Sequence, residues 1–387
     1  MSDRRLDLDW IRIAAFFLLV LYHCGMYYVT WDWHVKSPHA STTLEPLMLF
    51  SSPWRLSLLF LISGTATGCM FGSHPDRFLR MRSWRLLLPL VFGMLVIVVP
   101  QAYEQVVEQL PGGYHEGYLA FWKRYLLADH SFCRDGDCLD LPTWNHLWFV
   151  AYLWVYTVLG WSLLRFAPAW SQRLGAGLGR LLSGAGVLIW PTLVLAIARL
   201  TLVERFPSTH ALAGDWYNHA QYLPLFLLGV LCATQSAFWD AMHRHRRIAG
   251  GIALVGYGVL VWYFYGSGYS DEAHPPPTWL REAQRVVWAA YQWAIIVAIF
   301  GFARGMHFRE THTLQYLREA VFPVYILHQT ITVVLAHHLQ RFDLPVIVEG
   351  PLLVLATYAL CFAGFEIVRR IRWLRPLFGL KWTATAV

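Results

Sequence analysis

Ten long apolar segments recur along the 387-residue chain, and they limit the folds that it can adopt. Each is long enough, or nearly so, to cross a hydrocarbon core of about 30 Å as a helix. Because lipid offers the backbone no hydrogen bonds, runs of this length predict helices rather than a barrel. The expected spans are 10–29, 47–71, 84–106, 144–165, 184–202, 219–236, 247–266, 284–304, 314–337 and 346–372. The predicted fold is all-α: a polytopic membrane protein built as a bundle of about ten transmembrane helices.

The composition agrees with a membrane protein. Charged residues make up 14% of the chain, whereas a soluble globular chain carries about 25%. The 20 tryptophans and 19 tyrosines fit the aromatic belts at membrane surfaces. The net charge of +7 does not indicate nucleic acid, because basic patches with stacking aromatics are absent outside the apolar segments. We therefore expect membrane lipids as partners, no nucleic acid, and a first segment that stays as an anchor rather than a cleaved signal.

The positive charges favour one orientation. Alternate connections hold nineteen lysines and arginines, and the other connections hold eight. By the positive-inside rule, both termini should lie in the cytoplasm. Two outer connections, 107–143 and 267–283, are then long enough to act as lids or binding loops, although solvated connectors are the alternative. Composition does not shift along the chain, so we expect residues 1–387 to form a single integral membrane domain.

Cys133 and Cys138 lie in a polar turn of the first outer connection. If this loop faces an oxidising compartment, the two thiols can form a local disulfide. Two thiols alone make a poor zinc site, so no metal is expected there. The sequence leaves the bonded and the free states open.

The first apolar segment carries three ionisable residues in a pattern. Arg12 and His23 are eleven residues apart, or about three helical turns, so both should share one helix face about 16 Å apart. Asp9 can pair with Arg12 at the spacing of three. Arg12 is then either an interfacial anchor that snorkels to the headgroups or a phosphate ligand held by Asp9. His23 is either a hydrogen-bonded packing residue or a general base, and it has no partner at metal-ligand spacing.

Other polar residues in the spans have two interpretations each. The arginine cluster that includes Arg82 and Arg85 fits either the positive-inside rule or a polyphosphate donor. Arg55 precedes Ser63 and Gly64, where small residues allow helices to approach closely. At the start of the fourth span, belt packing and sugar binding are both open for His146 and Trp148. His328 lies mid-span in the ninth segment and is another candidate at catalytic depth.

Several motifs are missing from the chain. It contains no Walker loop, no dinucleotide glycine motif, no HExxH helix and no Gly-x-Ser-x-Gly elbow. ATP-driven transport and hydrolase chemistry of the serine type are therefore disfavoured.

The order of the polar motifs resembles the membrane-bound acyltransferase family 3. An arginine, ten residues and a histidine form its first-span signature, which Arg12 and His23 match, with Asp9 at the acidic position. Residues 33–37 resemble the branch that succinylates periplasmic glucans. One departure, Thr-Ala-Thr after Gly64 where an aromatic residue is expected, leaves the acyl group open. Four further motifs match: Arg55 followed by residues 60–64; Arg82 and Arg85 followed by Pro89; residues 146–149; and residues 325–329.

The resemblance implies an enzyme that acylates a carbohydrate across a bacterial inner membrane. Acyl-CoA, as succinyl-CoA or acetyl-CoA, would be the cytoplasmic donor, and a periplasmic glucan or other glycan would be the acceptor. His23 would act as the base, with Arg12 and Asp9. Donor contacts would come from Arg12, Arg82, Arg85 and Ser63. Acceptor contacts would come from Arg55, His146, Trp148, His328, Trp33 and His34.

Three alternatives remain open at this point. A transporter or flippase for a glycan would use His23 to carry protons. A structural partner in a glucan-synthesis complex would perform no chemistry. The His23 step itself is either direct base catalysis or a covalent acyl-histidine relay. The sequence also leaves the oligomeric state open, a homo-oligomer included.

Overall fold

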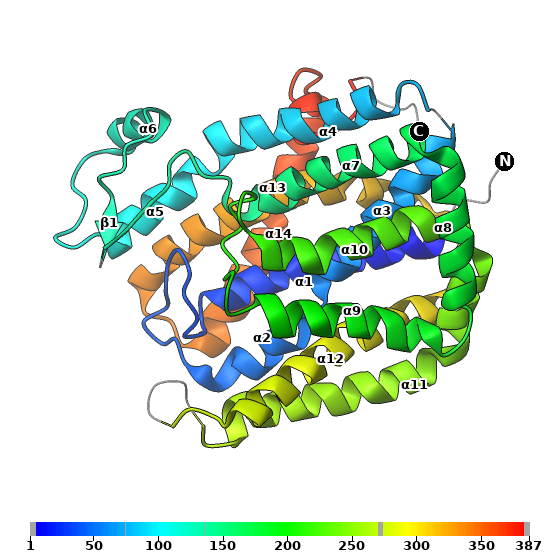
Figure 1. The fold of residues 1–387 in the computed structure, drawn as a ribbon. Coiled ribbons are helices and arrows are strands. Elements are labelled where there is room, and N and C mark those ends of the chain that lie inside the picture. The colour runs from blue at the N-terminus through cyan, green and yellow to red at the C-terminus, as the bar shows by residue number, and fades with distance from the viewer. Residues whose placement is uncertain (1–4, 74, 135, 270–273, 383–387) are drawn as a thin grey trace. The chain divides into compact units, whose positions relative to one another are not determined.

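The computed structural model describes residues 5–73, 75–134, 136–269 and 274–382, and nearly all regular structure in these ranges is helical (Figure 1). The α-helices are α1 Leu6–Met26, α2 Glu45–Ser51, α3 Arg55–Ser73, α4 Phe78–Phe92, α5 Val99–Gln109, α6 Tyr118–Leu126, α7 Trp148–Phe166, α8 Pro168–Leu181, α9 Gly186–Leu202, α10 Trp216–Cys232, α11 Ser236–Val261, α12 Thr278–Arg304, α13 His312–Leu339 and α14 Val346–Arg370. Two π-helical segments, η2 Gly93–Ile97 and η4 Trp262–Gly266, extend α4 and α11. The 3₁₀ turns are η1 Thr42–Leu44, η3 Asn145–Leu147, η5 Gln340–Phe342 and η6 Arg375–Phe378, and the strands are β1 Cys133–Arg134 and β2 Asp137–Cys138.

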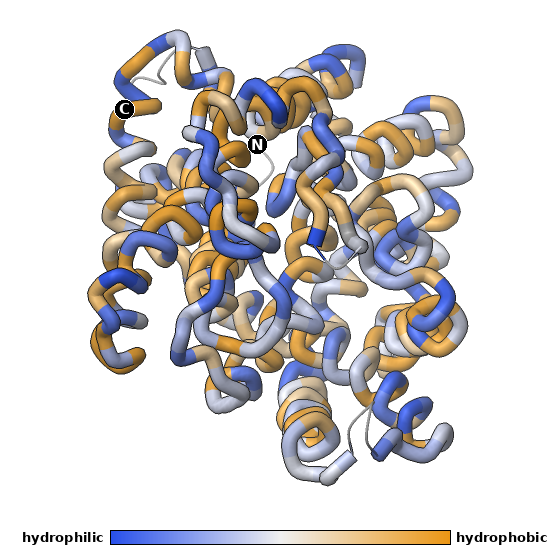
Figure 2. Tube along the Cα trace, turned by 90° about the vertical axis from the view of Figure 1, so that its left-hand side faces the viewer, coloured by the Kyte–Doolittle hydropathy of each residue, from blue (hydrophilic) through white to orange (hydrophobic). Residues whose placement is uncertain are grey.

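Every predicted apolar segment coincides with a helix, which confirms the all-α polytopic fold. Within the described residues, eight helical stretches are long and apolar enough to cross a membrane, or nine if the bent pair α8 and α9 counts as one. The predicted spans 184–202 and 219–236 became α9 and α10, which have 17 residues each. At about 1.5 Å per residue such a helix reaches only about 26 Å. Figure 2 shows apolar residues recurring along the helical segments.

The chain divides into two compact units, each assembled from separate stretches of sequence. The first unit holds the chain up to Ala15, Leu49–Arg80 and Tyr152–Leu314; the second holds Phe16–Met48, Met81–Ala151 and the chain from Gln315 onward. Helix α1 therefore contributes its first half to one unit and its second half to the other. The prediction of a single domain stays a prediction.

In the first unit, close helix packing depends on glycine. Helix α3 packs on α10, and α12 packs on α9 and α11. A Cβ on Gly64 would lie 1.9 Å from Phe226 O, and one on Gly229 would lie 2.3 Å from Leu61 O. Only glycine permits this approach, as expected for small residues at a membrane helix interface. The close approach that the sequence predicted at Gly64 is therefore confirmed.

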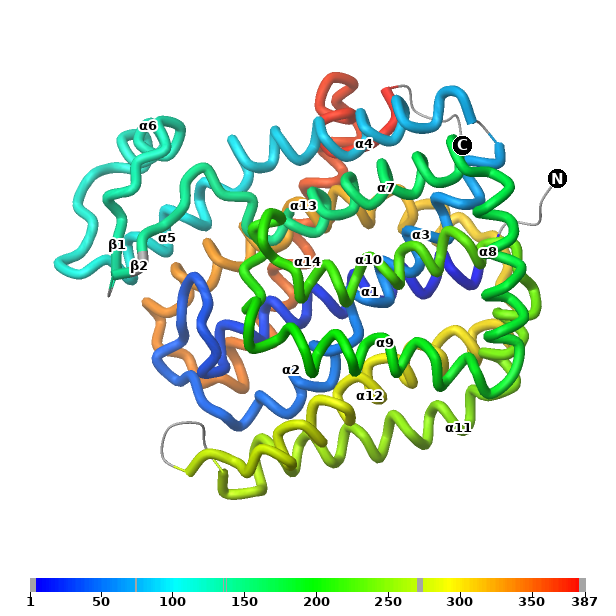
Figure 3. Tube along the Cα trace, viewed as in Figure 1, coloured from blue at the N-terminus to red at the C-terminus, as the bar shows by residue number. Residues whose placement is uncertain are grey.

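In the second unit, apolar side chains of α1, α13 and α14 form one core. Fully or nearly fully buried members come from all three helices, for example Val20, Val333 and Leu353. Separately, residues 99–141 have a small core of their own, in which Val106, Phe121 and others pack together. The outer connection 107–143 is therefore a compact region. Helix α6 and the β1–β2 hairpin adjoin α5 (Figure 3).

The hairpin brings the two cysteines of this region together. Cys133 and Cys138 are paired across β1 and β2, and their sulfur atoms are bonded. The structure thus selects the bonded state that the sequence had left open.

Residues 27–41 fold back over the end of α1. The Lys36 ammonium donates hydrogen bonds to Met26 O at 2.8 Å and to Val29 O at 2.7 Å. A lysine placed in this way satisfies carbonyl groups that a helix end leaves without partners. Lys36 thereby fixes the last turn of α1, which carries His23.

Candidate functional site

Two histidines that are 305 residues apart in sequence meet in the second unit. His23 Nδ1 lies 2.7 Å from His328 Nε2. The two imidazole rings are also stacked, with centroids 4.9 Å apart and planes inclined by 15°. His328 is fully buried, whereas His23 is half-buried. The predicted catalytic histidine therefore has a second imidazole as its immediate partner.

The hydrogen bonds fix which ring nitrogens carry protons when both imidazoles are neutral. His328 Nδ1 lies 2.6 Å from Tyr325 O, and a carbonyl oxygen can only accept, so His328 Nδ1 is the donor. His328 Nε2 then carries a lone pair and accepts from His23 Nδ1. In this tautomer the lone pair of the His23 ring is on Nε2, which takes no part in the His23–His328 hydrogen bond. The arrangement orients a base in the way that a third group orients the histidine of a catalytic triad.

His146 braces this pair from η3. Its Nε2 donates to Ile326 O at 3.1 Å, and its Nδ1 accepts from the Gln101 amide at 3.3 Å. The Tyr325 hydroxyl donates in turn to His146 O at 2.5 Å. The His146 ring meets the His328 ring edge to face, with centroids 5.1 Å apart. Both nitrogens of His146 thus bind within the protein, which supports a positioning role beside His328.

His34 reaches the same network from the loop after α1. Its Nδ1 donates to Gln105 Oε1 at 2.6 Å, and its Nε2 accepts from the Gln329 amide at 2.9 Å. Burial lowers the pKa of His34, which favours the neutral ring that this pattern requires. The Gln109 amide donates to the carbonyl oxygens of Trp33 and His34. Trp33 and His34, which the sequence predicts to contact the acyl acceptor, are therefore hydrogen-bonded to α5.

One face of α1 leads from Arg12 to His23. The helix is continuous from Leu6 to Met26, so both side chains share a face as the sequence predicted. Arg12 Nη2 lies 3.4 Å from Asp9 Oδ1, and the predicted pair is formed. His23 belongs to the last turn of α1, nearer the helix end than the expected span 10–29 implied. The helix ends earlier because the chain turns back at Tyr27, where Ser37 N donates to Tyr27 O.

Between these two residues, the same face of α1 lines an apolar hollow in the second unit. Phe16 and Val20 lie four residues apart and, with His23, follow one helical stripe. The other lining side chains come from α1, α13 and α14; they are Phe17, Leu317, Ala320, Val321, Val324 and Phe362.

The remaining predicted residues lie in both units. Arg55 and Ser63 belong to α3 of the first unit, where buried Arg55 donates to Ser51 Oγ at 2.9 Å. In the second unit, Arg82 and Arg85 lie three residues apart on α4, the former half-buried and the latter exposed. Trp148 is buried at the start of α7. None of these arginines contributes to the histidine network as described above.

The sequence interpretation missed the glutamines of α5. Gln101, Gln105 and Gln109 recur every four residues, so they lie on one helix face. Gln101 Oε1 accepts from the Gln329 amide at 3.1 Å, and the Gln101 amide donates to Thr330 Oγ1 at 2.6 Å. A polar stripe in an apolar span is itself a signal of function, and it could have been found from the spacing alone.

Comparison with known protein families gives a match over almost the whole chain. The profile of the acyltransferase 3 family, described as an acyltransferase domain, matches residues 5–366. The matched range includes every residue of the histidine network.

Characterised relatives give the same picture. Glucans biosynthesis protein C of Escherichia coli O6:K15:H31 (strain 536 / UPEC) is 24% identical over 344 residues, which cover 86% of this chain and 83% of the relative. The protein of the same name from Escherichia coli (strain K12) is 23% identical over the same shares of both chains. No solved structure matches the chain.

Proposed function

We propose that this chain moves an acyl group from acyl-CoA to a hydroxyl of an extracytoplasmic glucan. The premise is that the chain belongs to the acyltransferase 3 family and is a membrane acyltransferase. The observation that carries this proposal is the His23–His328 pair. Its hydrogen bonds direct a proton onto His23 Nδ1 and a lone pair onto His23 Nε2. A neutral imidazole held in this tautomer is suited to general base catalysis.

The proposed step conserves atoms and charge. His23 Nε2 takes the proton of the acceptor hydroxyl while its oxygen attacks the thioester carbonyl carbon. The carbon–sulfur bond then breaks, and the CoA thiolate takes the proton from the His23 imidazolium. The products are an ester and free CoA. His328 accepts the His23 Nδ1 hydrogen bond throughout, so it stabilises the imidazolium that forms between the two proton transfers.

The donor would lie along the face of α1. Arg12, held by Asp9, presents a guanidinium fork of the kind that binds phosphate oxygens. About 16 Å separates Arg12 from His23 along the helix, a length that an extended pantetheine arm can span. The apolar side chains of Phe16 and Val20 on this face would give that arm an environment without competing charges. Arg82, Arg85 and Ser63 remain proposed donor contacts.

The acceptor would arrive from the opposite side of the membrane. Two relatives carry the name glucans biosynthesis protein C, which supports a glucan acceptor. The Cys133–Cys138 bond suits a loop in an oxidising compartment, and this supports a periplasmic position for 107–143. We propose a bacterial inner-membrane location with both termini cytoplasmic, succinyl or acetyl as the acyl group, and Trp33, His34, His146, Trp148, Arg55 and His328 near the acceptor path.

The test is ester formation by the purified, reconstituted protein. Liposomes containing it are supplied with succinyl-CoA or acetyl-CoA and with periplasmic glucan, and the glucan is analysed by mass spectrometry. We expect ester from one of the two donors, and a loss of about 10²- to 10⁴-fold in the His23→Ala variant, the range for a general base. Free CoA should appear in equal amount to ester.

Two results would contradict the proposal. Glucan that crosses the liposome membrane without gaining an ester would support transport instead. Ester that forms at the same rate in His23→Ala, with the variant folded by size-exclusion chromatography, would remove His23 from the chemistry.

A further inference from the structure

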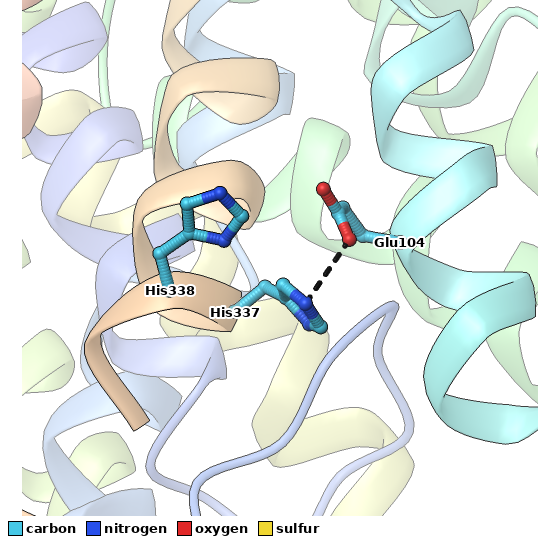
Figure 4. Close-up of side chains that lie close together, drawn as sticks. All are labelled: Glu104, His337 and His338. Carbon is cyan, nitrogen blue, oxygen red and sulfur yellow. Dashed lines mark ion pairs between the residues drawn. The ribbon is translucent and has the colours of Figure 1, made fainter. Parts of the chain in front are cut away.

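A second polar cluster lies in the second unit, away from the His23–His328 pair. Glu104 on α5 faces His337 and His338 near the end of α13 (Figure 4). One ligand atom from each of the three residues lies within 4.8 Å of the others. Two imidazoles and one carboxylate form a set of donors that zinc and its neighbours prefer.

The His337 ring is already oriented for a metal ion. Its Nδ1 lies 2.7 Å from Glu108 Oε1, and its Nε2 lies 3.4 Å from Glu104 Oε2. If the single proton of a neutral ring is donated from Nδ1 to Glu108, then the Nε2 lone pair points at the Glu104 carboxylate. Two acceptors facing each other leave room for a cation, either a proton or a metal ion, between them. A carboxylate behind a ligating imidazole is also the usual outer partner of histidine in zinc sites.

The separation between two of the ligand atoms fits a tetrahedral ion. With bonds of about 2.0–2.2 Å, two ligands of a tetrahedral zinc ion lie about 3.4 Å apart. The separation of His337 Nε2 from Glu104 Oε2 is 3.4 Å. His338 is exposed, and one of its ring nitrogens lies within 4.8 Å of the ligand atoms of Glu104 and His337. Its exposure also gives an ion a path from solution.

Charge also favours a cation at this place. Glu104 is buried, Glu108 is largely buried, and they lie four residues apart on one face of α5. Like charges at this spacing destabilise a helix. Arg341 is near enough to interact electrostatically with Glu104 and His338, but its side chain is exposed to solvent. A divalent ion would neutralise both carboxylates, with Glu104 as ligand and Glu108 behind His337.

We propose that Glu104, His337 and His338 bind a divalent transition-metal ion of the zinc class, with water at the remaining position. The ion joins α5 to α13, the two helices that also hold Gln101 and Gln329 together. His337 follows His328 by nine residues on α13, or about 14 Å along the helix axis. The metal site therefore stabilises the frame of the histidine network from a distance and does not take part in acyl transfer.

The experiment measures metal binding directly, so its result does not depend on the proposed acyl transfer. The full chain is purified in detergent without a histidine tag, freed of metal with a chelator, and titrated with Zn²⁺ by calorimetry. Bound zinc is counted by mass spectrometry of the metal. Co²⁺ serves as a second probe, because its visible absorption bands report tetrahedral coordination by nitrogen and oxygen. Melting curves with and without Zn²⁺ report the effect on stability.

We expect one zinc ion per chain and a higher melting temperature in its presence. The His338→Gln variant removes an exposed ligand, so it should fold normally while losing both the Co²⁺ bands and the zinc-dependent rise in melting temperature. Glu104→Gln should behave in the same way. Glu108→Gln should weaken zinc binding by about 10- to 100-fold, as for outer-shell partners. His307→Gln, which changes an exposed histidine elsewhere, should leave binding unchanged.

Equal zinc affinity in the wild type, His338→Gln and Glu104→Gln would overturn the proposal. Failure of the wild type to bind a stoichiometric ion would overturn it as well. In that event His337 is an imidazolium that bridges Glu104 and Glu108, and the cluster is an ion-pair network alone.

Discussion

His219 in the first unit and His23 in the second are both half-buried, but their ring nitrogens are used differently. His219 Nε2 donates to Leu212 O at 2.7 Å, and its Nδ1 accepts from the Tyr156 hydroxyl at 2.8 Å. His23 instead donates from Nδ1 to a second imidazole, that of His328. Both nitrogens of His219 are therefore engaged by fixed groups of the protein, whereas the His23–His328 bond directs a lone pair onto His23 Nε2.

Under the proposed function, the contrast separates a histidine that holds the fold from one that is arranged for chemistry. The His219 ring hydrogen-bonds a carbonyl at one nitrogen and a hydroxyl at the other, so it belongs to a structural network. Tyr325 O accepts from His328 Nδ1, so His328 Nε2 accepts from His23 Nδ1. The lone pair of the His23 ring is then on Nε2. Burial and polarity alone do not distinguish the two histidines, but their known partners differ: a carbonyl and a hydroxyl for His219, and a second imidazole for His23.

The largest effect that separates the two regions should come from matched replacements by phenylalanine. His328→Phe keeps a planar ring but cannot accept a hydrogen bond from His23 Nδ1, so ester formation should fall about 100-fold, within the range for proton-transfer groups. His219→Phe should lower thermal stability and leave the rate per folded molecule unchanged. Both rates are measured as glucan ester formed by equal amounts of monodisperse protein.

Replacement of His328 by glutamine sharpens this test. The glutamine amide oxygen can accept from His23 Nδ1, so His328→Gln should retain more activity than His328→Phe. Equal losses in the two variants would mean that the ring of His328, rather than its acceptor nitrogen, is what matters.

The next effect concerns stability in the first unit. Buried Asp215 accepts from the Tyr152 hydroxyl at 2.5 Å, from Asn218 Nδ2 at 2.8 Å and from His210 N at 3.0 Å. Asp215→Ala leaves these donors without that acceptor and should destabilise the protein by about 2 kcal/mol. Thermal or denaturant unfolding in detergent measures the change.

The matched control in the same unit is Asp240, whose side chain is 46% exposed and pairs with Arg304. Asp240→Ala should cost less than about 1 kcal/mol, as for exposed ion pairs. A fall in the rate per folded molecule of Asp215→Ala would assign the first-unit cluster a part in the chemistry.

The smallest effect is the pH dependence contributed by His34. Burial lowers its pKa in the folded protein, while the unfolded chain takes up the proton near pH 6.5. Stability should therefore fall as the pH drops below about 6.5 and level off below the folded pKa, with a slope of at most about 1.4 kcal/mol per pH unit. His34→Gln keeps both hydrogen-bond roles and does not titrate, so its melting temperature should decline less on acidification. An identical decline in both proteins would show that the pKa of His34 does not differ between the folded and unfolded states.

Much of the fold could be predicted from the sequence, because apolar length and period determine membrane helices locally. All ten expected segments became helices, and the close packing at Gly64 followed from its size. The exact ends of α9 and α10 could not be predicted, because the residues that end a helix depend on packing with other elements. The bend of 111° between α8 and α9 has the same origin.

Less of the site could be predicted. The shared face of Arg12 and His23 follows from helical spacing, and the Asp9–Arg12 contact follows from it too. The contact of His23 with His328 joins residues 305 positions apart, and no local pattern encodes such a pairing. The cluster of Glu104 with His337 and His338 could not be predicted for the same reason, because it joins α5 to the distant α13.

The central claim is that His328 acts through His23, and a double-mutant cycle tests it most directly. Ester formation is measured for the wild type, His23→Ala, His328→Phe and the double variant, on equal amounts of folded protein. If His328 serves only to orient His23, then the double variant retains the residual rate of His23→Ala, because groups that act as a unit are not additive. A double variant slowed further by the full factor that His328→Phe costs alone would contradict the account, since the two histidines would then act independently.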